Sequence, residues 1–255
     1  MRLFIAFLLT TLSLTSVAQS YCPPLYGKLG NVSRYHITAG YGLTKLYGDI
    51  QENVGTGSAV YLQFDYLLKK GLLIGIEGRF GSLITDSERY GENRHSRNEF
   101  KSFGFVFTFH PVAFFNGESY TVPSLMGTMA EALFVDFGWH RLSNHYQDIY
   151  RNPAAPDSYG PIDSYDENGV PIFSTKSKST VFPSLSFGFA IPLNKGYNIK
   201  GRYISIVPKM QLNFGVDDKI DGYTPYGWNG RPNDSKGDMY NYYSLGVRLF
   251  VLIFY

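Results

Sequence analysis

Residues 103–110 have the sequence FGFVFTFH, in which every second side chain is a phenylalanine. Successive side chains of an extended strand point to opposite faces, so the four phenylalanines share one face. Their neighbours on the other face, including Gly104, Thr108 and His110, are mostly small or polar. An unbroken aromatic face opposite a polar face predicts a β-strand that separates an apolar medium from a polar one.

The same period of two recurs in eight segments of the chain. Several exceed the usual strand of about 5–6 residues and suit tilted strands across a bilayer, which need about 9–11 residues. The eight segments cover residues 34–47, 57–68, 72–85, 99–114, 129–146, 179–192, 198–214 and 240–255.

A soluble sandwich or lipocalin also has alternating strands, with its apolar face turned inward. Its outer face would then carry lysine, glutamate, threonine and asparagine, whereas the polar face here carries mainly glycine, serine and a few charges of both signs. This composition fits a narrow barrel interior, and the long apolar face fits lipid contact. The sequence therefore predicts an all-β fold, an eight-stranded antiparallel up-and-down transmembrane β-barrel.

The links between the segments alternate in length, as in outer-membrane barrels, whose periplasmic turns are short and whose outer loops are long. Tight turns are expected at residues 69–71 and 194–196, and the link 115–128 is intermediate. Both termini then lie in the periplasm, and the last residue is an aromatic one, Tyr255. Pro208 should cause only a local defect in the seventh segment, because proline lacks the ladder donor. The long links cover residues 48–56, 86–98, 147–178 and 215–239.

Composition and the N-terminal sequence predict the location. The chain has 255 residues, of which 44% are hydrophobic and 17% charged, and its net charge of +2 indicates no nucleic-acid partner. Its single cysteine excludes an internal disulfide framework. Residues 1–18 have the positive start, short apolar run and small-residue end of a secretory signal peptide. We expect a signal peptide (1–18), an N-terminal extension (19–33) and an outer-membrane barrel (34–255).

The inward faces of the predicted strands carry three acidic and three basic residues. An eight-stranded barrel has room only for its own side chains or for one small ligand. Because a buried charge without a partner is costly, these residues should form an ion-pair network in the lumen. The network would make the interior a solid plug, and the alternative is a narrow gated channel. The six residues are Asp65, Glu77, Arg79, Asp136, Lys209 and Arg248.

A lipid-modifying enzyme is a further, less favoured alternative. Residues 140–144, HRLSN, superficially resemble the His–Ser motif of outer-membrane lipid A deacylases. His140 and Ser143 should lie on opposite faces of a strand, however, because only residues i and i+2 share a face. No phosphate loop, nucleophile elbow or zinc-spaced ligand set occurs. Two groups of loop residues carry oxygen ligands suited to calcium, but neither has the complete calcium motif with its terminal glutamate: Asp163, Asp166 and Asn168, and Asp217, Asp218 and Asp221. We therefore expect no catalysis, no metal and no cofactor.

The expected outer loops are rich in tyrosine, asparagine and glycine, a composition suited to contact with a partner. Residues 166–169, DENG, should form the tip of a hairpin, because Asn-Gly favours a tight turn. Lys45 falls on the outward face near the outer rim, where its ammonium group can reach lipid headgroups. The loop aromatics expected to make contacts are Tyr150, Tyr159, Tyr165 and Trp228.

Several stretches resemble a family of proteins. Residues 41–50, YGLTKLYGDI, are similar to the first strand and outer turn of small outer-membrane barrels common in Bacteroidota. Residues 97–102 resemble their fourth-strand entry, and residues 217–223 with 238–240 resemble their last loop and closing strand. The relatives include OmpA-type barrels and barrel components of the type IX secretion and gliding apparatus. The resemblance implies no catalytic residues.

These features together predict a non-enzymatic outer-membrane barrel with a structural or accessory role. Its loops or periplasmic turns would engage a protein partner in the cell envelope, for example in a protein-secretion apparatus, and its wall would contact outer-membrane lipid. A narrow gated channel and a lipid-modifying enzyme remain the alternatives.

Overall fold

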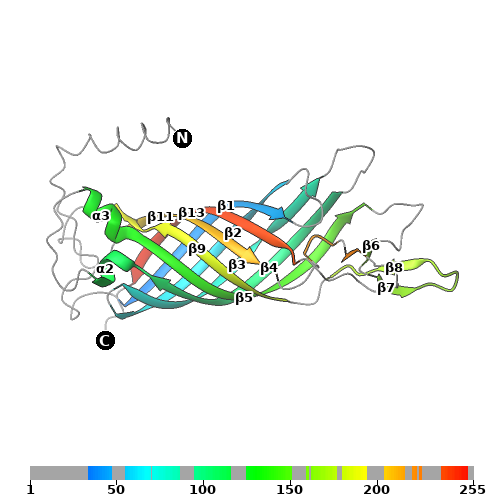
Figure 1. Cartoon of the computed structure of the whole chain (residues 1–255), viewed down its shortest axis with the longest axis horizontal. Coiled ribbons are helices and arrows are strands. Elements are labelled where there is room, and N and C mark those ends of the chain that lie inside the picture. Colours follow the sequence, from blue (N-terminus) through cyan, green and yellow to red (C-terminus); the bar gives the residue numbers. More distant parts are fainter. Residues whose placement is uncertain are drawn as a thin grey trace.

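The computed structural model shows a closed β-barrel (Figure 1). The predictions for the signal peptide, the N-terminal extension, Trp228 and Tyr255 lie outside the residues that the structure describes. Those residues are 34–47, 55–69, 71–86, 95–115, 125–150, 159–160, 162–176, 180–193, 204–215, 220–222, 224–225 and 237–251.

Eight long strands make the barrel wall, and each is antiparallel to its neighbours. The ring is closed because β1 pairs with both β2 and β13, while β9 pairs with both β5 and β11. The predicted eight-stranded antiparallel up-and-down barrel is confirmed. In ring order the strands are β1 (Tyr35–Tyr47), β2 (Thr56–Lys69), β3 (Leu72–Asp86), β4 (His95–Phe109), β5 (Leu133–Ile149), β9 (Thr180–Phe189), β11 (Ile204–Phe214) and β13 (Met239–Val251).

The connection after β4 differs from the prediction, which continued that strand to residue 114 and began the next at residue 129. The strand ends at Phe109, and two helices, α2 (Pro111–Phe115) and α3 (Leu125–Ala132), precede β5. Pro111 explains the end of the strand, because proline cannot donate to a ladder but suits the first position of a helix. An apolar run by itself does not distinguish a strand from a short helix.

Pro208 produces the local defect that the sequence predicts. β9 pairs with β11 on one side of Pro208, and the short strand β10 (Ile191–Pro192) pairs with β11 on the other side in the same register. Between them, the backbone N–H of Ala190 donates to the carbonyl of Ala132 at 2.9 Å. The predicted segment 179–192 is thus divided into β9 and β10, but the wall continues.

The two ends of the barrel differ (Figure 1). We call the end that carries α2, α3 and the turn at Gly71 the inner end, and the opposite end the outer end. Gly71 has a φ of 77°, which glycine adopts without steric cost. The outer end carries the two longest links, between β5 and β9 and between β11 and β13, and a projecting hairpin whose tip lies at residues 166–169, as predicted. The predicted alternation of short and long links does not hold throughout, because the β4–β5 link at the inner end, residues 110–132, is longer than the outer links 48–55 and 87–94. The short strands at the outer end are β6 (Tyr159–Gly160), β7 (Ile162–Tyr165), β8 (Pro171–Phe173) and β12 (Thr224–Pro225), with β6 paired to β12 and β7 to β8.

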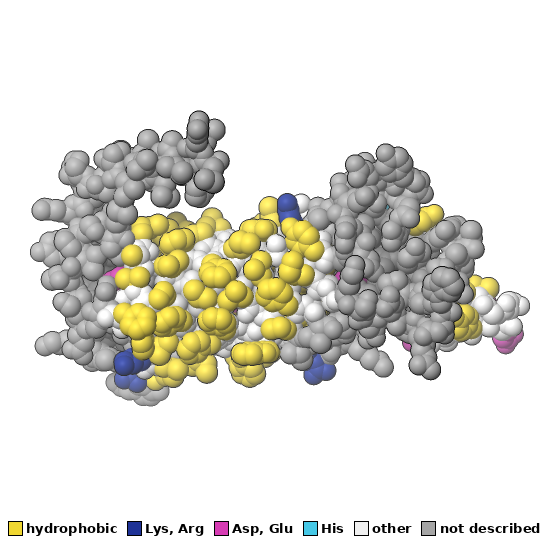
Figure 2. All heavy atoms as spheres, in the orientation of Figure 1, with side chains coloured by type: hydrophobic (Ala, Val, Ile, Leu, Met, Phe, Trp, Pro, Cys, Tyr) yellow, Lys and Arg dark blue, Asp and Glu magenta, His cyan; other side chains and the backbone are white. Residues whose placement is uncertain are grey.

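The outward faces of the barrel strands form an apolar belt, which is the yellow surface of Figure 2. Phe105 and Trp139 are 66% and 62% exposed. A continuous exposed surface of this kind around a closed wall fits contact with lipid and not with water. The long strands are therefore the elements that cross the membrane.

Among the described helices, none has the length and apolar character needed to traverse a bilayer.

Candidate functional site

The inward side chains fill the lumen in three layers. The inner layer contains the apolar cluster of Phe134, Ala190 and Val207. The central layer contains the charged residues around Glu77. The outer layer is a second apolar cluster, whose members are Leu46, Ala59, Tyr61, Leu83, Phe100, Leu142, Phe182, Ile220, Tyr240 and Tyr242.

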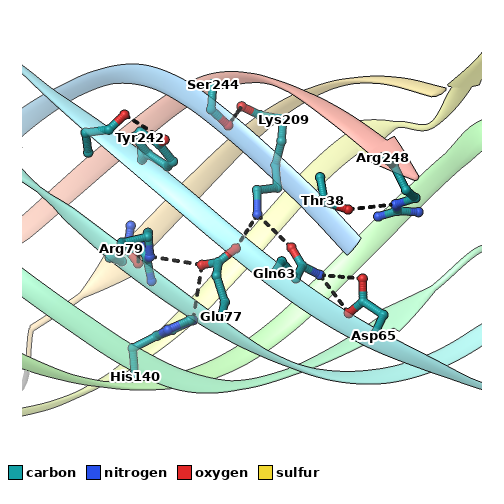
Figure 3. A network of polar contacts seen from close by, with 12 residues as sticks. Thr38, Gln63, Asp65, Glu77, Arg79, His140, Lys209, Tyr242, Ser244 and Arg248 are labelled. Carbon is teal, nitrogen blue, oxygen red and sulfur yellow. Dashed lines mark hydrogen bonds and ion pairs between the residues drawn. The ribbon is translucent and has the colours of Figure 1, made fainter. Parts of the chain in front are cut away.

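Glu77 is the centre of the central layer (Figure 3). Its Oε1 lies 2.9 Å from Nε of Arg79 on the same strand, and its Oε2 binds Nζ of Lys209 on β11. Because β3 and β11 are four strands apart around the ring, the Glu77–Lys209 ion pair spans the lumen. Nε2 of His140, on β5, lies 4.0 Å from Glu77 Oε1. A carboxylate held by two buried cations is stabilised as the anion and is not free to bind a substrate.

Hydrogen bonds extend the central layer to neighbouring strands. Nζ of Lys209 donates to Oε1 of Gln63 at 3.2 Å, and Nε2 of Gln63 donates to the carboxylate oxygens of Asp65 at 3.0 and 3.2 Å. On the other side, Nη1 of Arg79 donates to the hydroxyl of Tyr240 at 3.1 Å. The layer therefore links β2, β3, β11 and β13 through the interior as well as through the wall.

Arg248 and Asp136 lie apart from the ion pairs. Nε of Arg248 donates to Oγ1 of Thr38 at 3.1 Å, and its guanidinium carbon lies 5.5 Å from the ring centroid of Phe134. Asp136 is 2% exposed and forms no ion pair with any residue in the described part of the chain. All six residues predicted to line the lumen are buried, but ion pairs join only Glu77, Arg79 and Lys209.

Two glycines make the space that His140 occupies. A Cβ added at Gly104 would lie 2.6 Å from Nδ1 of His140, and a Cβ at Gly138 would lie 2.6 Å from its Nε2. Both separations are shorter than van der Waals contact. The narrow lumen therefore accepts an imidazole at this level only because two neighbouring positions lack side chains.

The outer layer differs from the prediction of a lumen lined by small and polar residues. Phe100, Phe182 and Tyr240 are at most 1% exposed, and the phenylalanine ring centroids lie 5.6 and 6.3 Å from that of Tyr240. The outer ends of several strands are apolar on both faces, as the neighbouring Tyr242 and Tyr243 illustrate. Apolar residues on both faces of a strand end could have predicted the outer layer. The regular apolar residues on the outward face drew attention away from those on the inward face.

The last loop turns back into the outer mouth of the barrel. Ile220 is 1% exposed and joins the outer layer. Its carbonyl accepts hydrogen bonds from Nδ2 of Asn98 at 2.7 Å and of Asn144 at 2.6 Å, and its N–H donates to Oδ2 of Asp238 at 2.6 Å. We call residues 220–222 the mouth plug. The mouth plug was not predicted, although the two asparagines at inward positions of adjacent strands indicate a need for buried partners.

Two of the predicted loop-contact residues, Tyr150 and Tyr165, have different surroundings. Tyr165, on β7, is 58% exposed and projects with the hairpin. Tyr150 instead packs its ring 6.0 Å from that of His95 at the outer end of β4. Tyr159 begins β6, so it lies where the longest loop pairs with the last one.

The candidates for catalysis and metal binding are separated or already engaged. His140 is buried in the lumen, whereas Ser143 faces outward, as the strand period predicts. Oδ1 of Asp166 accepts hydrogen bonds from the backbone N–H groups of Asn168 and Val170, at 2.8 and 2.7 Å, which stabilise the hairpin tip. Within the described ranges, no three His, Cys, Asp or Glu side chains are grouped to hold a metal ion.

Comparisons with known proteins give structural likenesses only. The sequence matches no protein-family model and no curated protein. Neisserial surface protein A has a TM-score of 0.45 and 11% identity, covering 86% of this chain and 98% of that one. Ail, the attachment invasion locus protein of Yersinia pestis, in complex with sucrose octasulfate, has a TM-score of 0.38 and 11% identity, covering 86% of this chain and 98% of that one. The outer membrane protein OprG from Pseudomonas aeruginosa has a TM-score of 0.38 and 9% identity, covering 86% of this chain and 97% of that one. Values this low support no statement about activity.

Proposed function

We propose that this protein is a non-enzymatic barrel of the outer membrane that presents its long loops at the cell surface and keeps its lumen closed. Lipid surrounds the apolar belt, and the loops at the outer end engage a partner in the cell envelope or outside it. The role is structural or accessory, because neither a substrate site nor a conducting path is needed to explain the described residues.

The filled lumen is the observation that carries this proposal. Glu77 and Lys209 join opposite walls in the central layer, and the aromatic side chains of the outer layer are almost completely buried. Ile220 and its hydrogen bonds then close the mouth. Water-filled channels belong to barrels with many more strands, about 16 or more. An ion would have to displace apolar rings and break buried ion pairs to pass.

The hairpin of β7 and β8 supports a role in contact. The hairpin lies beyond the ends of the barrel strands (Figure 1). Tyr165, Val170 and Ile172 are 58%, 55% and 49% exposed. Exposed apolar residues on a hydrogen-bonded hairpin provide the kind of surface that a protein partner can cover.

Conductance in planar lipid bilayers tests the closed lumen. Purified protein should insert without stepwise conductance, and deleting residues 220–222 should not open a stable channel, because the aromatic and central layers remain. Discrete conductance steps in the wild-type protein that change with Arg79→Ala or Asp136→Ala would establish the channel alternative in place of this proposal.

The lipid-modifying enzyme stays an alternative, and the link to a secretion apparatus stays a prediction. A lipid-modifying enzyme would change the mass of lipid A, and His140→Ala would abolish that change. His140 and Ser143 lie on opposite faces of β5, which argues against a reaction that uses both. A link to a protein-secretion apparatus, or to the barrel family of Bacteroidota, rests on sequence resemblance alone. Co-purification from native outer membrane, lost when residues 163–172 are deleted, would identify a hairpin-dependent partner.

A further inference from the structure

The outer wall carries a groove where the apolar belt ends. Its volume is about 760 Å³, and it runs across β2, β3, β4 and β5 near their outer ends. The groove is a depression because the outward side chains along its floor are serines. Aromatic side chains, which are larger, occupy outward positions nearby on the same wall. These floor residues are Ser58, Ser82 and Ser143.

The groove is lined by apolar and by basic side chains. Tyr41 and Phe80, 56% and 54% exposed, supply aromatic rings. Arg97, Lys101 and Lys176 supply cations, with Lys101 paired opposite Phe80, and all three side chains are exposed. An amphipathic ligand would meet rings and cations together.

The cations of the groove are available to a ligand. The groove also contains one carboxylate, Glu99, and one imidazole, His145, so three permanent positive charges face a single negative one. Within the described part of the chain, Arg97, Lys101 and Lys176 form no ion pair. Lys176 is held near β5 by a β-bridge between its backbone and that of His145. The three cations therefore give the groove a net positive charge and have no ion-pair partner among the described residues.

The belt is short on this side of the barrel. On β4 the outward residue after Phe103 is Lys101, and on β5 the outward residue after Trp139 is Arg141. Cations at this height lie where headgroups meet acyl chains, and their long stems allow the charge to reach the polar zone. A second groove on the wall, of about 810 Å³, shares Tyr41 with the first and has an apolar outward lining that includes Leu43, Phe187 and Leu245.

We propose that the groove between Tyr41 and Lys176 binds the phosphate-bearing headgroup of a glycolipid in the leaflet at the outer end of the barrel. The phosphates accept charge-assisted hydrogen bonds from Arg97, Lys101 and Lys176. The sugar lies over the serine floor, and the acyl chains follow the apolar wall toward the second groove. This inference rests on the proposed function only for the orientation of the barrel in an outer membrane.

The test is a lipid titration of the folded, detergent-solubilised protein, with native mass spectrometry to count bound lipid. Bisphosphorylated lipid A should bind at least tenfold more tightly than lipid A from which both phosphates have been removed. Inorganic phosphate at the same concentration should not displace it. Equal binding of the two lipids, or displacement by inorganic phosphate, would overturn a lipid headgroup site.

Two variants locate the site. Lys101→Gln combined with Lys176→Gln should weaken binding of the phosphorylated lipid about tenfold. Ser143→Phe, which fills the floor without changing the charge, should weaken it severalfold. A difference in gel migration between unheated and heated samples would show that both variants are folded.

Lys45→Gln is the matched control, because Lys45 lies outward at the outer end of β1 but does not line the groove. It should change affinity less than twofold. A loss as large as that of the double variant would mean that general surface charge, and not the groove, attracts the lipid, and the proposal would fail. Conductance by the wild-type protein would contradict the closed lumen while leaving this titration unchanged, so the two failures are distinguishable.

Discussion

The central and outer layers of the lumen lie next to each other yet hold the barrel together by different means. The central layer uses an ion pair between opposite walls, which stabilises only while both partners are present. The outer layer uses aromatic and aliphatic packing, in which each side chain contributes in proportion to the surface it buries. One narrow lumen is therefore closed by complementary charge at one level and by complementary shape at the next.

Removing the central carboxylate should have the largest effect. Glu77→Gln leaves Lys209 and Arg79 buried beside each other without a counter-charge, and we expect a loss of about 3–5 kcal/mol in the free energy of unfolding. Urea unfolding in detergent micelles, followed by tryptophan fluorescence, measures it. Glu99→Gln, on the exposed outward face, is the control and should change stability by less than about 0.5 kcal/mol. Equal losses of stability in Glu77→Gln and Glu99→Gln would mean that the central layer does not depend on its buried carboxylate.

A truncation in the outer layer should have the next largest effect. Leu142 is 1% exposed, so Leu142→Ala should leave a cavity and cost about 2–4 kcal/mol in the same assay. Leu142→Met, which conserves volume, should cost less than about 1.5 kcal/mol. If the two variants were equally destabilised, shape would not be what closes this layer.

Weakening the mouth plug should have a smaller and more local effect. Asn144→Ala removes one of the two side-chain donors to the Ile220 carbonyl, and the expected loss is about 1 kcal/mol. Hydrogen exchange of the backbone N–H of Ile220 should accelerate, while exchange in β3 should not. Accelerated exchange in both regions would mean that the plug and the central layer open as one unit.

Salt should have the smallest effect. The Glu77–Lys209 pair is at most 1% exposed, whereas the side chains of the His95–Asp148 pair at the outer rim are 43% and 69% exposed. Raising NaCl from 0.1 to 1 M screens exposed charges and hardly reaches buried ones, so unfolding should shift by less than about 0.5 kcal/mol. A shift that Glu77→Gln abolishes would mean that water enters the central layer.

Much of the wall could be predicted because strand periodicity is a local property. The run of phenylalanines from Phe103 to Phe109 identifies an outward face, and the structure places these side chains in the belt. Pro208 interrupts pairing without shifting the register, because the apolar residues on both sides keep their alternation. The helices at Pro111 and Leu125 were missed, because short apolar helices and strands are similar in composition.

The site was less predictable, because it depends on which residues meet across the lumen. Glu77 and Lys209 are 132 residues apart, and alternation places both inside without indicating that they touch. The same holds for Asp136, which is inward as expected but forms no ion pair with a described residue. The contact between Ile220 and the asparagines of β4 and β5 has no periodic signal at all.

The number of long strands and the face that each turns to lipid can be predicted from the amino-acid sequence. These features follow from the side-chain period of a strand and from the need to satisfy every backbone hydrogen bond within a membrane. Three features depend on the tertiary structure: the order of the layers in the lumen, the closing of the mouth by residues 220–222 and the basic groove on the outer wall. Each of these depends on strand stagger and barrel radius, which bring distant residues to the same height.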